Sequence, residues 1–519
     1  IGALMVIPGL VSAIYKEPLG VISFGISSLL ALIVGLILKH FGENSDMGRR
    51  EAFVTVSLSW LLAAMIGSLP YLILGLGPMN AIFESMSGFT TTGATILSQY
   101  NSEGYWIISP DLVQSSLAYA LAERAANYLT YCFPTDTIDL FFGLTLDLGD
   151  LLSVKGTYYG LLFWRSFSQF LGGLGIIMLF IAILPNLGLA GRELYSVDGL
   201  GLVKEAITPR VRNTAKTFWG IYLGLAGFEF ALLVGAGLPI YDALCTAFAS
   251  IATGGFSPVA YSIAKYNSIL VEVIVCIFLL LGGTNFIIYH KIILKRNFKS
   301  LIQDEEFKFY IFIILISVIM LMIWGRIPGS SFTALRSSIF QVASTMTTAG
   351  FVNNFDYDAW SIAAKVILIL LMTIGGCTGS TGGGIKVGRL LIVLKYTYNE
   401  LMRSLHPKAV MAVKIGDQVV KENTVKSVLL FVQLYLLIFI FGVLAFAITE
   451  ASNPQFNFLS AISATACCLG VVGPGFGVVA LDFAGVSEAG RALGFFFMYI
   501  GRLEILPVIL MLLPETWKR

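Results

Sequence analysis

Charge is scarce in this sequence. Only 12% of its 519 residues are charged, about half the share of an ordinary soluble domain, and the mean hydropathy is +0.84. The three histidines (His40, His290 and His406) each end an apolar run, and the six cysteines show no metal-ligand spacing. A nucleophile–base pair or a metal cluster therefore has few residues from which to form, and we do not expect an enzyme.

Long apolar runs are abundant. Several approach or reach the ~20 residues that a helix needs to cross a bilayer, among them residues 17–41, 269–289, 309–324 and 428–448. The short alternating strands of a transmembrane barrel are missing from the pattern. The sequence therefore predicts an all-α, polytopic membrane protein in a lipid bilayer, with an N-terminal transmembrane helix pair at residues 1–45.

Lysine and arginine gather in alternate connections, chiefly 192–216, 291–308 and 386–426. Because positively charged loops tend to stay in the cytoplasm, these connections are expected inside the cell and the intervening ones outside. One outer connection, at about 101–155, is long and acidic. We interpret it as an extracellular insertion that is either inert or concentrates cations at the surface.

A hydroxyl-rich run that ends in glycine recurs along the chain. Asn80–Gly93 reads NAIFESMSGFTTTG, Ser337–Gly350 reads SSIFQVASTMTTAG, and Tyr241–Gly254 and Asn457–Gly470 match in length. Each run is expected to begin at a helix-capping residue (Asn80, Asp242, Ser337 and Asn457). Each then forms a half-helix too short to span the bilayer, between two long helices. Such repetition predicts four tandem pore units, at residues 46–190, 191–298, 299–405 and 406–519.

Four re-entrant turns that meet on one axis could replace the water around a cation. Non-helical backbone is tolerated at membrane depth where it lines a water-filled cavity, and the negative ends of the half-helices favour a cation there. A ring of four carboxylates is not available, because Gln341 is the counterpart of Glu84, so backbone carbonyls are the expected ligands. The predicted filter residues are Thr91, Thr92, Gly93, Ala252, Thr253, Gly254, Thr348, Ala349, Gly350, Cys468, Leu469 and Gly470. Any single turn could instead be an ordinary helix cap.

The run GGCTGSTGGGIKVG at Gly375–Gly388 is unusually rich in glycine. Because each glycine costs ~1 kcal/mol relative to alanine in a helix, the third inner helix is expected to break here into a loop below the third turn. A phosphate-binding loop requires Gly-Lys followed by Ser or Thr. Here Ile385 separates Gly384 from Lys386 and Val387 follows, so we reject nucleotide binding.

A single arginine interrupts a second repeated feature. Glycine pairs occur in the inner helices at 172–173, 282–283 and 375–376, and the corresponding place in the fourth unit holds Gly501 and Arg502. Close helix packing explains the glycines. A charge near the bilayer centre usually faces a pore or a partner, so we predict that Arg502 obstructs cation passage and anchors the glycine-rich loop. The alternative is a structural salt bridge with Glu504.

The segments SGFTTTGAT, IATGGFSP, TTAGF, LFWRSFSQFLGGLGIIMLFIAILP and GGCTGSTGGGIKVGRLL together resemble the membrane subunits of the Trk/Ktr/HKT potassium transporter superfamily. The Trk branch, with its TrkH-like proteins, is the most similar. The resemblance implies a pseudo-four-fold pore of helix–pore loop–helix units and an intramembrane gate beneath the filter. The gate residues are then Gly375, Gly376, Cys377, Thr378, Gly379, Ser380, Thr381, Gly382, Gly383, Gly384 and Lys386, with Arg502 opposite them.

The resemblance also implies potassium uptake through a gated, moderately selective pore that passes rubidium and some sodium. It implies a homodimer in the bacterial inner membrane and a cytosolic, nucleotide-binding TrkA-like regulatory subunit. A nucleotide is expected only on that partner, potassium is the substrate, and neither a covalent cofactor nor a nucleic acid is expected. The chain departs from the family pattern at Val471, where family members often carry asparagine after the fourth filter glycine.

A secondary transporter that couples potassium to protons or sodium is the alternative. Coupled carriers usually show inverted repeats and ionisable residues at the midplane. In this sequence the repeats read as parallel, and the midplane acids are few, Glu229 and Glu272 being the candidates. This pattern favours a channel.

Overall fold

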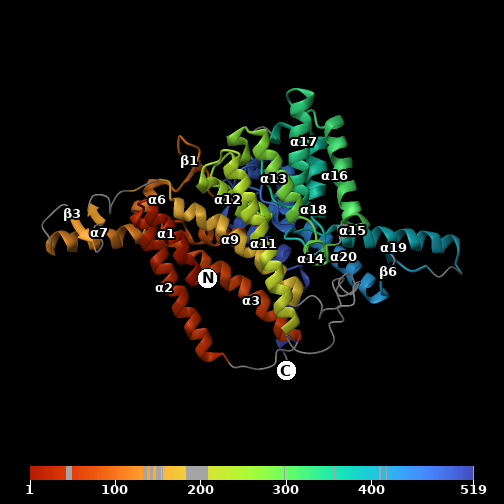
Figure 1. Ribbon diagram of the computed structural model, residues 1–519, viewed down its shortest axis with the longest axis horizontal. Helices are drawn as coiled ribbons and strands as arrows, with labels where there is room; N and C mark the ends of the chain where they lie inside the picture. Colours follow the sequence, from red (N-terminus) through yellow and green to blue (C-terminus); the bar gives the residue numbers. More distant parts are fainter. Residues whose placement is uncertain are drawn as a thin grey trace.

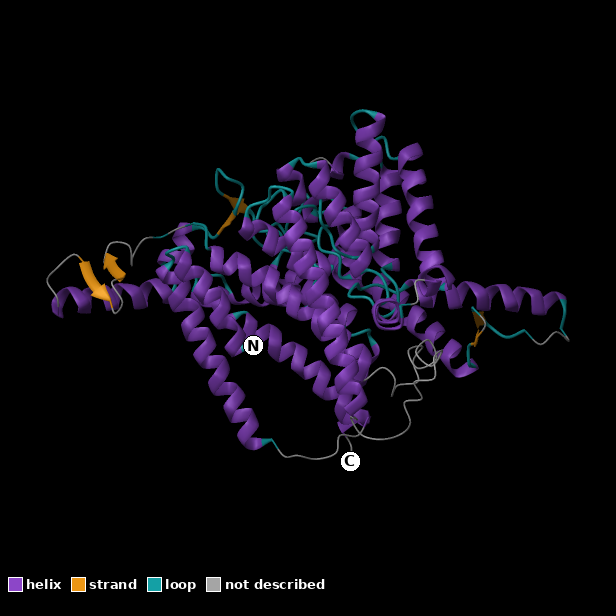
Figure 2. Cartoon of the chain, in the orientation of Figure 1, coloured by secondary structure: helices purple, strands orange, loops and turns teal. Residues whose placement is uncertain are grey.

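Helices account for most of the chain. A computed structural model describes residues 1–42, 49–132, 137–140, 144–147, 154, 156–182, 209–296, 299–354, 357–407, 411–416 and 418–517. In this part of the chain the strands form three two-stranded hairpins, β1–β2 (Gln99–Tyr100, Trp106–Ile107), β3–β4 (Thr137–Leu140, Leu144–Asp147) and β5–β6 (Lys414–Ile415, Gln418–Val419) (Figure 2). The predicted all-α membrane class is confirmed.

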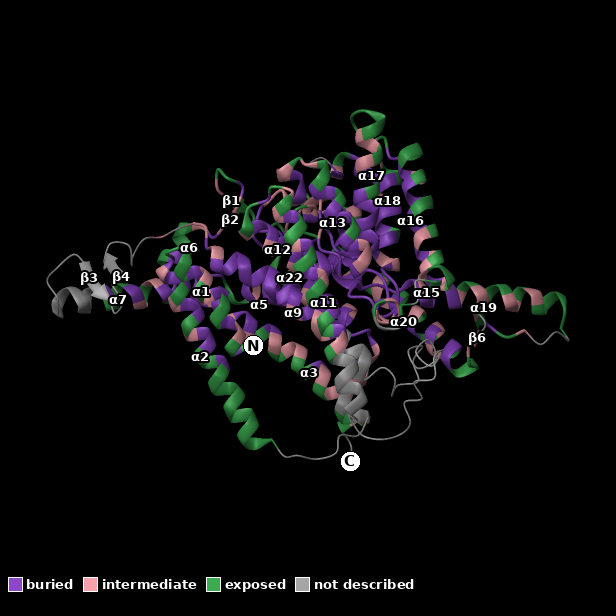
Figure 3. Cartoon of the chain, viewed as in Figure 1, coloured by how far each residue is buried: buried purple, intermediate pink, exposed green. Residues whose placement is uncertain are grey.

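Five spans in the described residues are long and apolar enough to cross a membrane. They lie in α2 (Pro18–Phe41), α3 with α4 (Arg49–Gly67, Leu69–Ile73), α11 (Pro209–Gly235), α16 (Glu305–Trp324) and α20 (Glu422–Thr449). Apolar side chains stay exposed along them, as on α2 in Figure 3 and at Ile440, which is 66% exposed. A continuous apolar surface of this kind is suited to lipid contact.

The order outer helix, short helix, turn and inner helix occurs four times. The sets are α3, α5 (Pro78–Phe89) and α9 (Tyr159–Ala182); α11, α12 (Ile240–Ile251) and α13 (Ile269–Gly282); α16, α17 (Ser331–Met346) and α18 (Ile362–Ile374); and α20, α21 (Phe458–Gly470) and α22 (Glu488–Arg502). The inner helix of each set packs on the short helix of the next: α9 on α12 and α13 on α17 (Figure 1), and likewise α18 on α21 and α22 on α5. The last contact joins the fourth set to the first, so the sets close on themselves.

Two further inner helices are interrupted, which the sequence analysis did not predict. The chain bends by 96° after α13 into α14 (Phe286–Lys295), and by 115° after α22 into α23 (Leu506–Leu512). The predicted break after α18 is present, and the chain becomes helical again in α19 (Val387–Leu405). The expectation of a long returning helix in every set is therefore correct only for α9.

Three of the four predicted helix caps are wrong. Asn457 does cap α21, accepting the N–H of Ser460 at 2.9 Å. By contrast, α5 and α12 follow Gly77 and Pro239 without a side-chain cap, and α17 begins earlier than Ser337, behind Ser330. The polar groups of Asn80 and Asp242 instead accept hydrogen bonds from Arg491 and Tyr105. These two side chains therefore bond to residues far away in the sequence instead of capping their own helices, as the local sequence pattern had predicted.

The described parts of the two peripheral segments, the N-terminal region and the connection at about 101–155, contain helices and one hairpin. The expected N-terminal pair consists of the short α1 (Val6–Ile14) and the long α2. The insertion contains α6 (Pro110–Gln114), α7 (Leu117–Cys132) and the β3–β4 hairpin. The predicted unit boundaries at 45/46 and 190/191, residues 192–208 of the first basic connection, and residues 133–136, 141–143, 148–153 and 155 of the insertion lie outside the described residues.

The cap of α21 can be tested directly. Replacement of Asn457 by alanine leaves the N–H of Ser460 without its acceptor and should lower the free energy of unfolding by about 1 kcal/mol. Asn457→Asp keeps an acceptor oxygen and should retain most of the stability. Thermal unfolding in detergent measures both variants, and equal stability of Asn457→Ala and the unmodified protein would contradict the assigned cap.

Candidate functional site

Each short helix ends in the same backbone turn. The residue that begins the turn is left-handed, with φ between 51° and 62°, at Thr91, Thr253, Thr348 and Val471. The next residue donates its N–H to the carbonyl five positions earlier, at 2.7–2.9 Å, as Thr92 does to Ser87. A glycine with positive φ follows, and these four are Gly93, Gly255, Gly350 and Gly473. The shared geometry makes these turns structurally equivalent.

The sequence alignment of the turns was right at Gly93 and Gly350 and wrong at the other two. The equivalent glycine of the second turn is Gly255 rather than Gly254, and that of the fourth is Gly473 rather than Gly470. Cys468 and Leu469 are residues of helix α21, and Ala252 only caps α12. The second turn contains two adjacent glycines and the fourth has lost its threonines, so the pattern alone could not fix the register there.

The four equivalent glycines form a closed ring of backbone contacts. A Cβ atom on Gly93 would overlap the carbonyl oxygen of Gly254 in the second turn, and one on Gly255 would overlap that of Ala349 in the third. The same relation joins Gly350 to Val472, and Gly473 to Thr92 of the first turn. Each turn therefore touches the next in chain order, and the fourth touches the first. Only glycine, without a Cβ, permits so close an approach.

Glycines of the inner helices bring these helices against the ring. A Cβ on Gly172, Gly282 or Gly501 would lie too close to a carbonyl at the C-terminal end of a short helix, that of Phe89, Ile251 or Leu469 respectively. Close backbone packing is thus the role of this glycine, as small residues commonly provide at helix contacts. The next position holds glycine in the other inner segments and Arg502 in α22.

Hydroxyl groups support the turns, as predicted from the threonines. The Thr90 hydroxyl donates to the carbonyl of Met86 at 2.7 Å and lies 2.8 Å from that of Thr92, and the Thr347 hydroxyl donates to Ala343 at 2.8 Å. At the second turn the amide of Gln169 from α9 contributes as well. It donates to the carbonyl of Gly254 at 2.6 Å and accepts the N–H of Phe256 at 3.0 Å.

A buried ion pair holds the first two turns, and the sequence analysis did not single it out. The guanidinium of Arg165 on α9 donates to Glu84 on α5 at 2.7 Å, and both side chains are at most 1% exposed. The same guanidinium reaches the hydroxyl of Thr95 at 2.9 Å and the carbonyl of Ser257 at 3.2 Å. An arginine within the apolar run 161–182 and a glutamate within a half-helix were the signals that could have revealed the pair.

The glycine-rich loop, residues 375–386, lies against three of the turns. Gly383 donates its N–H to the Thr348 hydroxyl of the third turn at 2.8 Å, and a Cβ on Gly383 would overlap the carbonyl of Gly470 beside the fourth. The hydroxyls of Thr381 and of Thr253 in the second turn are 3.1 Å apart. Lys386 folds back within the loop and donates to the carbonyl of Gly382.

Arg502 bridges this loop to the first inner helix. Its guanidinium donates to the carbonyl of Thr381 at 2.6 Å and to that of Gly172 at 3.2 Å, and the residue is 2% exposed. The alternative of a salt bridge with Glu504 is wrong, because the Glu504 carboxylate pairs with Arg389. A positive charge therefore lies beneath the turns, held by backbone carbonyls.

Away from the loop, the ring borders a cavity of about 100 Å³, lined by Gly93, Gly255, Gly350, Pro474 and Arg165 together with residues that connect the short helices to the inner helices. Within the described residues there is no cluster of three or more His, Cys, Asp or Glu side chains that could hold a metal ion. The only ligands that the ring itself offers are backbone carbonyls and threonine hydroxyls, which suit a weakly hydrated monovalent cation.

The two acidic candidates for coupling make helix-to-helix contacts. Glu272 on α13 accepts hydrogen bonds from Arg336 on α17 and, at 3.1 Å, from the amide of Asn353. Glu229 on α11 accepts a hydrogen bond from the hydroxyl of Ser250 on α12. Both carboxylates are buried, and neither lines the cavity at the ring.

Comparisons with known proteins agree with this geometry. A family model described as TrkH, cation transport protein, matches residues 153–517. The Trk system potassium uptake protein TrkH of Salmonella typhimurium is 32% identical, with 99% of this chain and 96% of the relative covered. TrkG of Escherichia coli, of the same system, is 30% identical over the same shares. The crystal structure of the potassium transporter TrkH from Vibrio parahaemolyticus superposes with a TM-score of 0.80 at 30% identity, covering 100% of this chain and 96% of that one.

Loss of one partner of the Arg165–Glu84 pair should lower the free energy of unfolding by more than the net electrostatic energy of the pair. Removal of one partner by Arg165→Ala or Glu84→Ala leaves a buried charge unpaired and should lower the free energy of unfolding by about 3–5 kcal/mol. The double variant Arg165→Ala/Glu84→Ala removes both charges and should lose less stability than the sum of the losses in the two single variants. Denaturation in detergent measures this cycle, and simple additivity would show that the two side chains do not act as a pair.

Proposed function

Because the chain belongs to the TrkH family of cation transport proteins, we propose that it takes up potassium through the ring formed by its four turns. The names of the relatives support potassium as the ion. The closed cycle of contacts among Gly93, Gly255, Gly350 and Gly473 supports a path at the centre of the ring, and it is the observation that carries the proposal. The path lies in the cell membrane, which in a bacterium is the inner membrane.

The filter is proposed to consist of Thr91–Gly93, Thr253–Gly255, Thr348–Gly350 and Val471–Gly473. Carbonyl oxygens around one axis replace the hydration shell of a potassium ion. The C-terminal ends of α5, α12, α17 and α21 point their partial negative charge to the same place. Each turn offers a short run of backbone, so selectivity is moderate, and rubidium and some sodium pass as well.

The gate is proposed to be the loop at 375–386 together with Arg502. The loop lies against the turns on the side away from the cavity, and the guanidinium of Arg502 ties it to α9 through the carbonyls of Thr381 and Gly172. A fixed positive charge on the path raises the energy of any cation that approaches it. Passage then requires that the loop and Arg502 move apart.

A gated channel driven by the membrane potential is favoured over a coupled symporter. Glu229 and Glu272 are engaged with Ser250 and Arg336, away from the ring, and the four sets of helices follow one another in the same order. Flux that persists without a proton or sodium gradient is the outcome this proposal requires. The units at 46–190, 191–298, 299–405 and 406–519 and the N-terminal pair at 1–45 remain our proposed organisation.

The active assembly is proposed to be a homodimer bound to a cytosolic, nucleotide-binding TrkA-like subunit. The basic connection at 386–426, which includes α19 and the β5–β6 hairpin, is the proposed docking surface, since it directly follows the loop. Co-purification of the tagged membrane chain with a soluble nucleotide-binding protein is the measurement that tests this partner.

The filter assignment predicts the effect of Gly93→Ser. The new side chain meets the carbonyl of Gly254 and should displace a ligand of the ion, reducing discrimination between potassium and sodium about tenfold, or about 1.4 kcal/mol. Sodium competition with rubidium uptake into liposomes measures this. Gly237→Ser is the matched control, because Gly237 has a φ of +93° and no atom within 4 Å of an added Cβ. Unchanged sodium competition in Gly93→Ser would overturn the filter assignment.

The gate assignment predicts that Arg502→Ala raises rubidium flux several-fold in liposomes without the cytosolic partner. The loop loses its tether to α9, and the path loses a positive charge. Arg491→Ala, on the same helix, removes a contact with Asn80 far from the loop and should leave flux unchanged. A folded Arg502→Ala protein with flux at or below that of the unmodified chain would contradict the gating role.

A further inference from the structure

Three consecutive acidic residues begin α16, and each has a different partner. Asp304 caps its own helix, accepting the N–H of Phe307 at 2.8 Å. Glu305 and Glu306 reach out to other elements. We propose that Glu306 is a positioning residue that holds the glycine-rich loop in its blocking position, and that Glu305 connects this hold to the β5–β6 hairpin. The proposal rests on the gate proposed above.

Glu306 binds both the glycine-rich loop and the helix that follows it. Its Oε1 atom accepts the N–H of Thr378 inside the loop and, at 2.9 Å, the N–H of Gly388 in the first turn of α19. The residue is 3% exposed, and a buried carboxylate at a helix N-terminus is favoured by the helix dipole. One carboxylate oxygen therefore fixes the distance between the loop and the helix that follows it.

There is no room beside this carboxylate for a side chain at position 388. A Cβ on Gly388 would lie 2.6 Å from the Thr378 hydroxyl and 2.8 Å from Oε1 of Glu306. Thr378, Glu306 and Gly388 thus form a close-packed junction. A change of one member must move another, because such packed contacts do not deform continuously.

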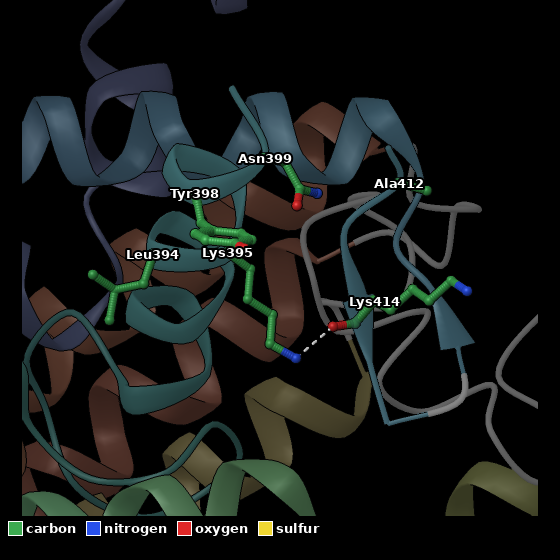
Figure 4. A pocket seen from close by; sticks show the side chains of 6 residues that line it. All are labelled: Leu394, Lys395, Tyr398, Asn399, Ala412 and Lys414. Carbon is green, nitrogen blue, oxygen red and sulfur yellow. Dashed lines mark hydrogen bonds between the residues drawn. The ribbon is translucent and has the colours of Figure 1, made fainter. Parts of the chain in front are cut away.

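Glu305 makes the corresponding contacts on the exposed side. Its carboxylate pairs with Lys395 on α19 and accepts the N–H of Gly416 at the tip of the β5–β6 hairpin at 2.7 Å. Lys395 also donates to the carbonyl of Lys414 at 2.7 Å, as Figure 4 shows. A hollow between α19 and the hairpin is lined by Leu394, Lys395, Tyr398, Asn399, Ala412 and Lys414.

A small hydrophobic cluster holds the hairpin against α19 and α20. Val413 beside β5 packs with Ile392 of α19 and with Val425 and Val428 of α20, apart from the two main hydrophobic clusters. Since Glu305 and Glu306 are adjacent in one helix, a shift of the hairpin and α19 relative to α16 would change the contacts of both carboxylates. The first turn of α16 is thus a mechanical link between the hairpin and the gate loop.

The experiment compares rubidium flux into liposomes for Glu306→Ala and Glu306→Gln in the full chain without a cytosolic partner. The alanine variant frees the N–H groups of Thr378 and Gly388 and should raise flux several-fold with an unchanged rubidium-to-sodium ratio. The glutamine variant keeps an acceptor oxygen and should remain close to the unmodified protein. A non-specific leak caused by misfolding would also raise flux, but it would lower the rubidium-to-sodium ratio.

Two further variants address the same junction without removing the carboxylate. Gly388→Ala pushes against Oε1 of Glu306 and should also raise flux, whereas Glu305→Ala, which releases the hairpin, should raise it less. Glu400→Ala, which breaks the exposed contact with Arg403 on α19, is the matched control and should have no effect.

Flux at or below the unmodified level in both Glu306→Ala and Gly388→Ala overturns the positioning role, and so does equal behaviour of Glu306→Ala and Glu306→Gln. Flux of Glu305→Ala equal to that of the unmodified chain overturns the link to the hairpin. Arg502→Ala, measured in parallel, distinguishes a failure of the positioning role of Glu306 from a failure of the proposed gate. If it raises flux while the Glu306 variants do not, only this inference fails; if it too has no effect, the proposed gate fails.

Discussion

The contact between a glycine and the carbonyl of the next turn is the constraint on which the rest of the structure depends. Four such contacts close a cycle from Gly93 through Gly255 and Gly350 to Gly473. The inner helices approach through Gly172, Gly282 and Gly501, and each packs against the end of a short helix. The width of the ring is therefore determined by backbone atoms, and a side chain at any of these places would force the turns apart.

The charged groups lie where the four sets differ from one another. Arg165 and Glu84 are paired at the first turn, and Arg502 replaces in the fourth inner helix a glycine present in the other sets. Buried charges are costly unless they are paired or hydrogen-bonded, and these guanidinium groups bond to atoms of two or three sets at once. The repeated backbone thus provides the ring, and the unrepeated charges join particular sets to one another and to the loop.

The sequence predicted the elements well and their register poorly. Apolar runs of ~20 residues and equal spacing between glycines were enough to identify the outer helices, the short helices and the break after Ile374. Register failed at Gly254, where two glycines are adjacent, and at Gly470, where no threonine marks the turn. The Arg165–Glu84 pair and the bends after α13 and α22 depend on contacts between segments far apart in the chain, which local patterns do not contain.

The fourth turn shows how such contacts replace local propensity. Val471 is left-handed with a φ of +62°, a conformation that costs an L-residue about 1–2 kcal/mol and suits valine poorly. Favourable contacts with neighbouring residues must offset this conformational cost. Val471 is fully buried, and Gly383 of the loop approaches both its side chain and the carbonyl of Gly470 so closely that no Cβ fits. The loop therefore contributes to the shape of the turn, and any displacement of the loop would remove packing that holds Val471 in this conformation.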